Sequence, residues 1–326
     1  MFFRFSEIIN KINDAGRSNT SFLFGIDFEM NEGFFVKDPL QQQAVLFHFN
    51  GIGNSTQGIE EIPSFHFSAS PDTFATYEAR FNTVMSSIQK DEVRLVNLTV
   101  KTPIECSLPL SDIFHYSNAR YRLYIPNKFV CFSPETFVAI EKGKIRTFPM
   151  KGTIEATIPN AASIILNDPK ESAEHRDSVA LLISDLERAS TDVSVKRFRY
   201  IDTLTTNKGE ILQVSSEIEG TLQDHYRNNI GALLSELLPA GSIAGVPKVK
   251  SLDIIREAEQ TSRGYYTGIA GYFDGEKLDT CVLIRFIEQE GDRLFFRSGG
   301  GITAQSNCEK EYNEAIRKIY LPFPCS

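Results

Sequence analysis

The chain lacks tryptophan altogether and is poor in cysteine and histidine, with five of each among its 326 residues. The cysteines are odd in number and far apart, and none forms a Cys-x-x-Cys pair; they are Cys106, Cys131, Cys281, Cys308 and Cys325. This pattern argues against a disulfide framework and against a zinc site. It is typical of reduced thiols, so we expect a cytoplasmic protein.

The histidines are His48, His66, His115, His175 and His225. No two of them have the spacing of metal ligands along a helix or strand. We therefore expect structural roles for them, and we look elsewhere in the chain for groups that carry chemistry.

An excess of positive charge is also missing: 34 lysines and arginines face 42 acidic residues, which gives a net charge of −8. A surface for nucleic acid or for an anionic membrane would need a basic footprint, so we expect neither partner. No basic N-terminal start precedes an apolar run, and no apolar segment is long enough to cross a bilayer. An anionic substrate would be bound by a few well-placed cations.

Length and composition are ordinary for a globular protein, with 41% apolar and 23% charged residues. A chain of 326 residues suits one large domain or two intimate ones. Hydrophobic spacing predicts a short N-terminal helix, helices over 71–89, 108–114, 168–189, 230–238 and 308–318, and a helix beginning at Pro247 with Val249 on its apolar face. Strands are predicted over 21–28, 44–49, 93–100, 195–206, 209–218, 265–273, 279–287 and 293–297.

The central stretch of the chain reads as a β-hairpin. Two β-prone runs, 136–141 and 144–148, flank the turn Lys142-Gly143. The register of this hairpin puts Glu135 opposite residue 150, so Glu135 and Lys151 lie side by side at its open end. An acid beside an amine is a proton donor beside a potential nucleophile. The other interpretation is a cross-strand ion pair on a solvated hairpin.

Three further features could carry chemistry or merely structure. Glu174 follows the strong helix start Asp168-Pro169 and is either a ligand or a solvated first-turn residue. Arg285 lies in an apolar run predicted as a buried strand, where a guanidinium needs a carboxylate partner. The three glycines at 299–301 would let a ligand approach the backbone closely.

The last helix carries Glu311, Glu314 and Lys318 on one face. Two carboxylates one turn apart suit a hard divalent ion such as Mg²⁺, or they form a solvated charged face. The Gly-rich turn 240–246 before Pro247 is either an anion-binding helix N-terminus or an ordinary tight turn.

These stretches, in this order, resemble the chorismate-utilising enzymes, and most closely their aminodeoxychorismate synthase component I branch. The resemblance covers roughly residues 120–321, whereas 1–120 match only loosely, as a shortened N-terminal part of a single chorismate-binding catalytic domain over 1–326. Its strongest pieces are Ser133-Pro134-Glu135, Pro149-Met150-Lys151-Gly152-Thr153, Gly245-Val246-Pro247-Lys248, Tyr266 with Gly271-Tyr272-Phe273, Asp279-Thr280-Cys281 with Ile284-Arg285, Gly299-Gly300-Gly301 and Glu311-x-x-Glu314-x-x-x-Lys318. The resemblance implies an α+β fold in which two antiparallel β-sheets pack together with helices outside.

The resemblance also implies roles for single residues. Lys151 matches the lysine that attacks C2 of chorismate, and Glu135 matches the acid that protonates the departing C4 hydroxyl. Glu174 and Glu314 match Mg²⁺ ligands, with Glu311 beside them. Substrate contacts are implied for Gly152, Thr153, Gln213, Ser242, Tyr266, Arg285, Gly299, Gly300, Gly301 and Lys318.

The implied reaction converts chorismate and ammonia to 4-amino-4-deoxychorismate, a step toward 4-aminobenzoate and folate. Ammonia would come from a glutamine amidotransferase subunit. Gln213 departs from the family, since most relatives carry histidine there, and glutamine does not titrate near neutral pH. Two alternatives stay open: isochorismate or anthranilate formation on the same scaffold, which Lys151 argues against, and a catalytically inactive chorismate-binding subunit, which Gln213 suggests.

Overall fold

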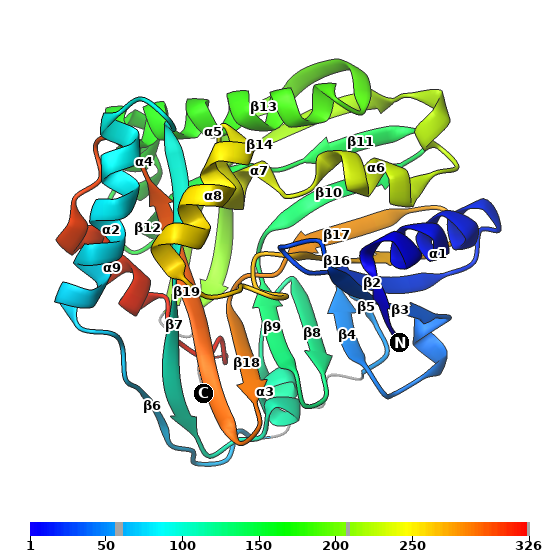
Figure 1. Ribbon diagram of the computed structural model, residues 1–326, viewed down its shortest axis with the longest axis horizontal. Coiled ribbons are helices and arrows are strands. Elements are labelled where there is room, and N and C mark those ends of the chain that lie inside the picture. The colour runs from blue at the N-terminus through cyan, green and yellow to red at the C-terminus, as the bar shows by residue number, and fades with distance from the viewer. Residues whose placement is uncertain (56–60, 207–208, 325–326) are drawn as a thin grey trace.

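Two antiparallel sheets with helices outside them make up the protein, as the computed structural model shows over residues 1–55, 61–206 and 209–324 (Figure 1). The first sheet runs in the order β1 (Phe2–Arg4), β3 (Glu32–Lys37), β2 (Phe22–Ile26), β16 (Ile269–Phe273), β17 (Leu278–Val282), β10 (Thr136–Glu141), β11 (Lys144–Thr147), β14 (Gly209–Leu222) and β12 (Met150–Glu155), and β13 (Ser190–Thr206) also pairs with β14. The predicted α+β architecture is confirmed.

The second sheet runs in the order β15 (Gly245–Val246), β7 (Leu95–Cys106), β19 (Arg293–Ile302), β18 (Phe286–Glu290), β9 (Phe129–Ser133), β8 (Tyr121–Ile125), β4 (Leu46–Phe49) and β5 (Ile52–Gly53), with β6 (Phe67–Ala69) beside β7. The helices are α1 (Phe5–Arg17), α2 (Phe74–Gln89), α3 (Leu110–Tyr116), α4 (Ala161–Asn167), α5 (Pro169–Glu187), α6 (Ile230–Leu237), α7 (Gly241–Ala244), α8 (Lys248–Glu259) and α9 (Cys308–Arg317), and two short 3₁₀ turns cover Pro39–Gln41 and Asp224–Tyr226.

Aromatic side chains fill the space between the two sheets. Leu23 and Tyr272 come from the first sheet and meet Phe47, Phe129 and Phe286 of the second. The rings of Phe47 and Tyr272 lie 5.2 Å apart across the interface. Burial of each such side chain contributes about 1.5–3 kcal/mol, so this layer holds the sheets together.

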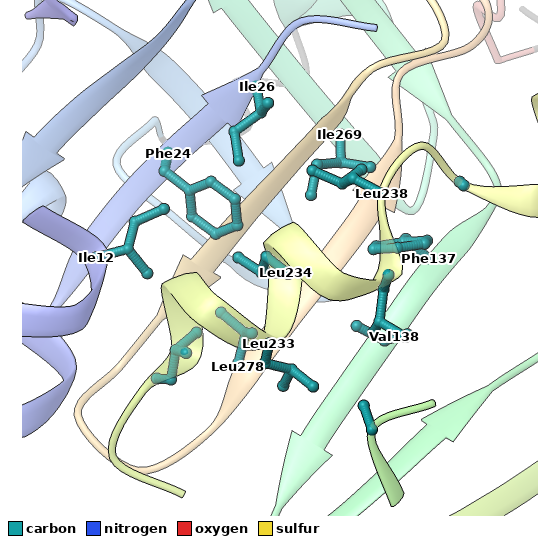
Figure 2. Packing of buried hydrophobic residues seen from close by; sticks show 14 of the residues in the cluster. Ile12, Phe24, Ile26, Phe137, Val138, Leu233, Leu234, Leu238, Ile269 and Leu278 are labelled. Carbon is teal, nitrogen blue, oxygen red and sulfur yellow. The ribbon is translucent and has the colours of Figure 1, made fainter. Parts of the chain in front are cut away.

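Helices α1 and α6 cover the outer face of the first sheet. Figure 2 shows Ile12 of α1 and Leu233 and Leu234 of α6 packed with Phe24 and Ile269 of the strands. On the second sheet, α2, α8 and α9 pack together against β7 and β19, at the left of Figure 1. These helices therefore fix the position of α9 relative to β19.

Two of the links by which the chain crosses between the sheets are neighbours, and they are called the first and the second crossing. The link from β9 to β10 contains Glu135, and the link from β17 to β18 contains Arg285. The Phe132 amide donates to the Arg285 carbonyl (3.0 Å), and the Val282 amide donates to the Glu135 carbonyl (3.1 Å). The fold thus brings an acid and a guanidinium, 150 positions apart in the sequence, to one place where the sheets meet.

The predicted hairpin forms, with Glu141 opposite Lys144. Beyond Thr147 its register does not continue, because β12 pairs with β14 rather than with β10, and Met150 lies opposite Ser215. Pro149 separates β11 from β12, and both strands lie along the same edge of β14. The approach of Glu135 to Lys151 therefore depends on this shift along β14 and not on simple hairpin pairing.

Several local predictions need correction. The run 279–287 is two strands in different sheets, so Arg285 lies in a link and not in a buried strand. Gly245 and Val246 form β15 against β7, which leaves no open anion-binding turn there. Val249 is 78% exposed, because α8 turns Ile254 and Ile255 to the core instead.

The start of α5 is as predicted, since the Asp168 side chain accepts a hydrogen bond from the Glu171 amide (2.9 Å) and Pro169 begins the helix. Cys106, Cys131, Cys281 and Cys308 are free thiols, and Cys325 lies outside the described residues. Within the described ranges, none of the helices has both the length and the apolar character of a membrane span.

Candidate active site

Glu135 lies at the first crossing, with its carboxylate anchored by α7. Ser242 donates to the Glu135 Oε1 (3.0 Å), and the Glu135 amide donates to the Ser133 hydroxyl (3.1 Å). Burial raises the pKa of Glu135, although the Ser242 hydrogen bond and the cations Lys151, Arg285 and Lys318 oppose that shift. A carboxyl group with a raised pKa that is fixed in one position suits a proton donor.

Lys151 extends from β12 with an exposed side chain. Within the part of the chain that the structure describes, its amine has no hydrogen-bond or ion-pair partner. Burial raises the pKa of Glu135 and of Glu171 on α5, and the charge of Lys151 opposes that rise; it also adds to the effect by which Lys318 lowers the pKa of Glu314 on α9. The amine is therefore within electrostatic range of three carboxylates from three different parts of the chain.

A β-bulge next to Lys151 brings α5 close to the strand. The register of β12 on β14 shifts between Met150 and Thr153, and Gly152 has a φ of +85°. A Cβ at this position would meet the Glu171 Oε2 at 2.8 Å, so Glu171 packs directly over Gly152. Sequence reasoning used Glu171 only as a helix-start residue; its spacing to Glu174 (i, i+3), the same as in the α9 pair, was the signal that could have found it.

Thr153 and Gln213 face each other across β12 and β14. The Oε1 of Gln213 is buried and has no hydrogen-bond partner among the described residues. A buried acceptor without a donor is costly, so this oxygen is positioned for a donor that is not part of the protein.

The second sheet contributes the three glycines and α9. Gly299, Gly300 and Gly301 lie inside β19, opposite Thr99, Leu98 and Asn97 of β7, although the strand was predicted to end at residue 297. A Cβ on Gly300 would lie 3.6 Å from both the Glu311 Oε2 and the Lys318 Nζ, and 3.7 Å from the Glu314 Oε1. The side chains of Glu311, Glu314 and Lys318, which were predicted to share one helix face, therefore converge above Gly300.

Each charged group of α9 is held in place. Lys318 pairs with Glu314 (2.7 Å) and donates to the Gly299 carbonyl (2.7 Å), while Ser306 donates to Glu311 (2.9 Å). Burial and the neighbouring Glu314 raise the pKa of Glu311. Burial works against ionisation of Glu314 too, but Lys318 still keeps the pKa of Glu314 below the usual value. Burial lowers the pKa of Lys318.

The three predicted metal ligands are brought together only in part. Glu311 and Glu314 share one position, and their oxygens suit a hard cation that keeps several waters. Glu174 pairs instead with Lys170 of its own helix (3.5 Å) and is half exposed. Over the described ranges, no group of three or more acidic, histidine or cysteine side chains could hold a metal ion, so the full ligand set stays a prediction.

Arg285 occupies the second crossing in a left-handed conformation, with a φ of +54°. Such strain is typical of positions where a side chain must be directed. Its Nε donates to the hydroxyl of Tyr320 (3.2 Å), a residue that sequence reasoning missed. Tyr266 is only 4% exposed, and burial raises its pKa to about 12, while Arg263 and Arg285 act in the opposite direction.

His175 is fully buried on α5, where its Nε2 and the Ser216 hydroxyl of β14 lie 2.7 Å apart. Burial, with a contribution from Arg199, lowers its pKa to about 4, so the ring is neutral at physiological pH. This histidine ties the helix that carries Glu171 and Glu174 to the strand that carries Gln213.

The arrangement unites a proton donor, an unpaired amine, a pair of carboxylates and a guanidinium. Such a set can bind a small dianion and activate a hydroxyl as a leaving group. In the fold, α5 packs on β12, β14 and α7, and α9 packs on β19 (Figure 1).

Comparisons with known proteins agree with this arrangement. The family model described as chorismate binding enzyme matches residues 39–323. A Haemophilus influenzae protein named an uncharacterized PabA-like protein is 46% identical over 317 residues, which are 96% of each chain. The Bacillus subtilis aminodeoxychorismate synthase component 1 is 30% identical over 268 residues, or 77% of this chain and 56% of that one.

Among solved structures, the menaquinone-specific isochorismate synthase of Escherichia coli matches with a TM-score of 0.72 over 96% of this chain and 80% of its own. Its identity to this chain is 17%, so this likeness concerns the fold alone. Taken with the family match over most of its length, the chain belongs to the family of chorismate binding enzymes.

Proposed function

We propose that this protein aminates chorismate at C4 to give 4-amino-4-deoxychorismate, with Lys151 as a covalent nucleophile. The observation that carries the proposal is the unpaired amine of Lys151 among Glu135, Glu171 and Glu314. The similarity to a relative named aminodeoxychorismate synthase component 1 supports the same reaction.

In the first step the unprotonated amine of Lys151 forms a bond to C2 of the ring. The two conjugated ring double bonds each shift by one position, the C4–O bond breaks, and Glu135 gives its proton to the departing hydroxyl, which leaves as water. The enzyme then carries a secondary ammonium on C2 and an ionised Glu135. Burial raises the pKa of Glu135, so the acid form needed at the outset is favoured.

In the second step ammonia forms a bond to C4, the two ring double bonds shift back, and the C2–N bond breaks. Lys151 leaves as a neutral amine, and the new ammonium at C4 returns one proton to Glu135. The net change is chorismate plus ammonia to aminodeoxychorismate plus water, and both residues regain their starting forms. A glutamine amidotransferase subunit would supply the ammonia.

The two carboxylates of chorismate would be bound on opposite sides of this chemistry. The ring carboxylate would accept from the backbone amides of Gly152 and Thr153, while Arg285 and Tyr266 would hold the enolpyruvyl carboxylate beside Gly299–Gly301. Lys318 would keep Glu314 ionised, and Gln213 would accept from a ring substituent.

Magnesium fits the carboxylates of Glu311 and Glu314, which face one position above Gly300. Glu174 would join them by releasing the exposed ion pair with Lys170, which costs little. When bound, the ion would supply positive charge that neutralises and orients the ring carboxylate.

Product identification tests the proposal. Purified protein is incubated with chorismate, Mg²⁺ and an ammonium salt, and in parallel with glutamine and an added amidotransferase. The products are then separated and identified by mass. We expect 4-amino-4-deoxychorismate in both reactions; anthranilate or isochorismate without it would overturn the proposal.

A second candidate is a chorismate-binding subunit without catalytic activity, which the departure at Gln213 favours. This candidate predicts that chorismate binds but that no product forms under either nitrogen source. It also predicts that Lys151→Ala has no effect on the function of the protein in the cell.

A further inference from the structure

The segment after α9 brings a phenol to the second crossing. The Ile319 amide donates to the Ile316 carbonyl (3.0 Å) and closes the helix just before Tyr320. Leu321 and Phe323, which follow, are each 6% exposed and belong to the core beneath the second sheet. Tyr320 is therefore fixed from both sides, by the helix end and by the buried tail.

The tail itself is anchored by specific contacts. The Asn118 amide donates to the Pro322 carbonyl (2.8 Å), and the Phe323 ring packs edge-on against Phe65 and Tyr116 at 5.3 and 5.9 Å. An anchored segment gives its side chains a defined direction at little further entropy cost.

Tyr320 directs the guanidinium of Arg285. The Nε of Arg285 donates to the Tyr320 hydroxyl (3.2 Å), and the guanidinium carbon lies 5.7 Å from the ring centre. Among the described residues, this is the one hydrogen bond that the guanidinium makes. The Arg285 backbone is fixed as well, through its carbonyl and the Phe132 amide.

The chemistry of the pair leaves two kinds of donor free. With Nε engaged, the Nη group on the same side as the Nε–H is still free to bind a carboxylate oxygen next to the phenol. The phenol oxygen accepts from Nε through a lone pair, so its own O–H hydrogen is still available to donate. A carboxylate oxygen on that Nη group lies beside the phenol and has lone pairs left for its hydrogen.

We propose that Tyr320 is a substrate-binding residue that completes a carboxylate site with Arg285. It orients the guanidinium through Nε, and it donates its hydroxyl to the same carboxylate that the neighbouring Nη group holds. The inference rests on the proposed function in that the carboxylate belongs to chorismate, specifically to the enolpyruvyl group assigned to Arg285.

The test is the equilibrium dissociation constant for chorismate, measured by calorimetry with Mg²⁺ and without a nitrogen source. Tyr320→Phe removes one hydroxyl and keeps the ring. A hydrogen bond to a charged group is strong enough that we expect the dissociation constant to rise about 10-fold or more. The turnover number at saturating chorismate should change by less than about twofold, since the phenol touches no reacting atom.

Tyr312→Phe is the matched control. Tyr312 lies on α9, and its hydroxyl donates to the Asp72 carbonyl (2.7 Å), away from Arg285. We expect chorismate binding to be unchanged in this variant. Tyr320→Leu, compared with Tyr320→Phe by thermal unfolding and by binding, separates loss of the hydroxyl from loss of the ring contact.

Equal dissociation constants for wild type and Tyr320→Phe, together with weaker binding in Arg285→Lys, would overturn the inference and make Tyr320 a structural residue. This outcome leaves the proposed amination intact. The formation of isochorismate by a wild-type protein whose chorismate affinity does depend on Tyr320 would instead overturn the proposed function and support this inference. Absence of chorismate binding by the wild type would overturn both.

Discussion

The two sheets contribute different kinds of side chain to the candidate site. On the side of the second sheet, Lys318 is bonded to Glu314 and to a carbonyl, Glu311 to Ser306, and Arg285 to Tyr320. On the side of the first sheet, the Lys151 amine and the Gln213 Oε1 have no partner among the described residues. The second sheet thus offers a preorganised binding surface, and the first sheet presents groups left free to react.

This difference follows from how the chain builds each side. Residues 293–324 form β19, α9 and the tail in one continuous segment, so neighbouring turns can satisfy one another's charges. The first-sheet side joins β12, β14 and α5 through a bulge at Gly152. Lys151 lies within that bulge, and its exposed amine has no partner among the described residues.

The sharpest test of the comparison is the removal of the free amine. Lys151→Met keeps the length of the side chain and should lower the rate of amination by at least ~10³-fold, because the nucleophile is lost. The dissociation constant for chorismate should change far less, because the residues proposed to hold its two carboxylates stay in place. Lys170→Met, on the same side but outside the proposed chemistry, is the control; a similar loss there would contradict the assignment.

Removal of the acid should have the next largest effect. Glu135→Gln cannot protonate the hydroxyl, and we expect a fall in turnover of about 10²–10⁴-fold with little change in chorismate affinity. Rates measured with chorismate derivatives that carry a better leaving group at C4 should be less affected. An equal loss for every leaving group would show that Glu135 is not the proton donor.

The pH dependence follows from the same group. Activity that needs protonated Glu135 is present below its pKa and is lost as the pH rises through it. Ser242 donates to the ionised carboxylate and lowers the pKa, so Ser242→Ala should move the basic limb of the turnover profile to higher pH. A limb that stays in place or moves to lower pH would contradict this role.

Substitution of one glycine in each sheet tests the difference between the two sides through protein stability. Gly152 has a φ of +85° and a carboxylate 2.8 Å from the Cβ position, so Gly152→Ala should cost about 1–2 kcal/mol in the free energy of unfolding. At Gly300 the atoms nearest to the Cβ position are 3.6 Å away, so Gly300→Ala should change the free energy of unfolding by less than about 0.5 kcal/mol. Denaturant unfolding measures both; equal losses would contradict the difference between the two sides.

The smallest expected effect concerns Lys170. Its exposed ion pair with Glu174 is worth about 0.3–0.5 kcal/mol, so Lys170→Ala should lower the half-saturating Mg²⁺ concentration by roughly twofold if Glu174 becomes a ligand. Lys37→Ala on β3 is a control of equal charge. If Lys170→Ala leaves the half-saturating Mg²⁺ concentration unchanged while Glu314→Gln raises it strongly, Glu174 is not a ligand.

The sequence allowed much of the fold to be predicted, because helix starts and hairpin turns are local signals. Asp168-Pro169 and Lys142-Gly143 behave as their chemistry requires. The crossing at Arg285 could not be predicted, since an apolar run of this length reads as a single strand whichever sheet it enters. Val249 was misplaced because helical spacing alone does not say which of two partly apolar stripes faces the core.

The sequence predicted many of the residues of the candidate site, but it predicted fewer of the contacts between them. Glu311, Glu314 and Lys318 converge as their helical spacing indicates. Tyr320 and Glu171 were missed, because each acquires its role from a contact across the fold, with Arg285 and over Gly152, and such contacts leave no local pattern in the chain.

The intact mass of the protein mixed with chorismate and Mg²⁺ in the absence of ammonia tests the central claim most directly. The account predicts a covalent adduct equal to chorismate less one water, mapped to the peptide that contains Lys151 and lost when ammonium is added with release of 4-amino-4-deoxychorismate. Unmodified protein at every time point, together with the same product formed at the wild-type rate by Lys151→Met, would contradict it.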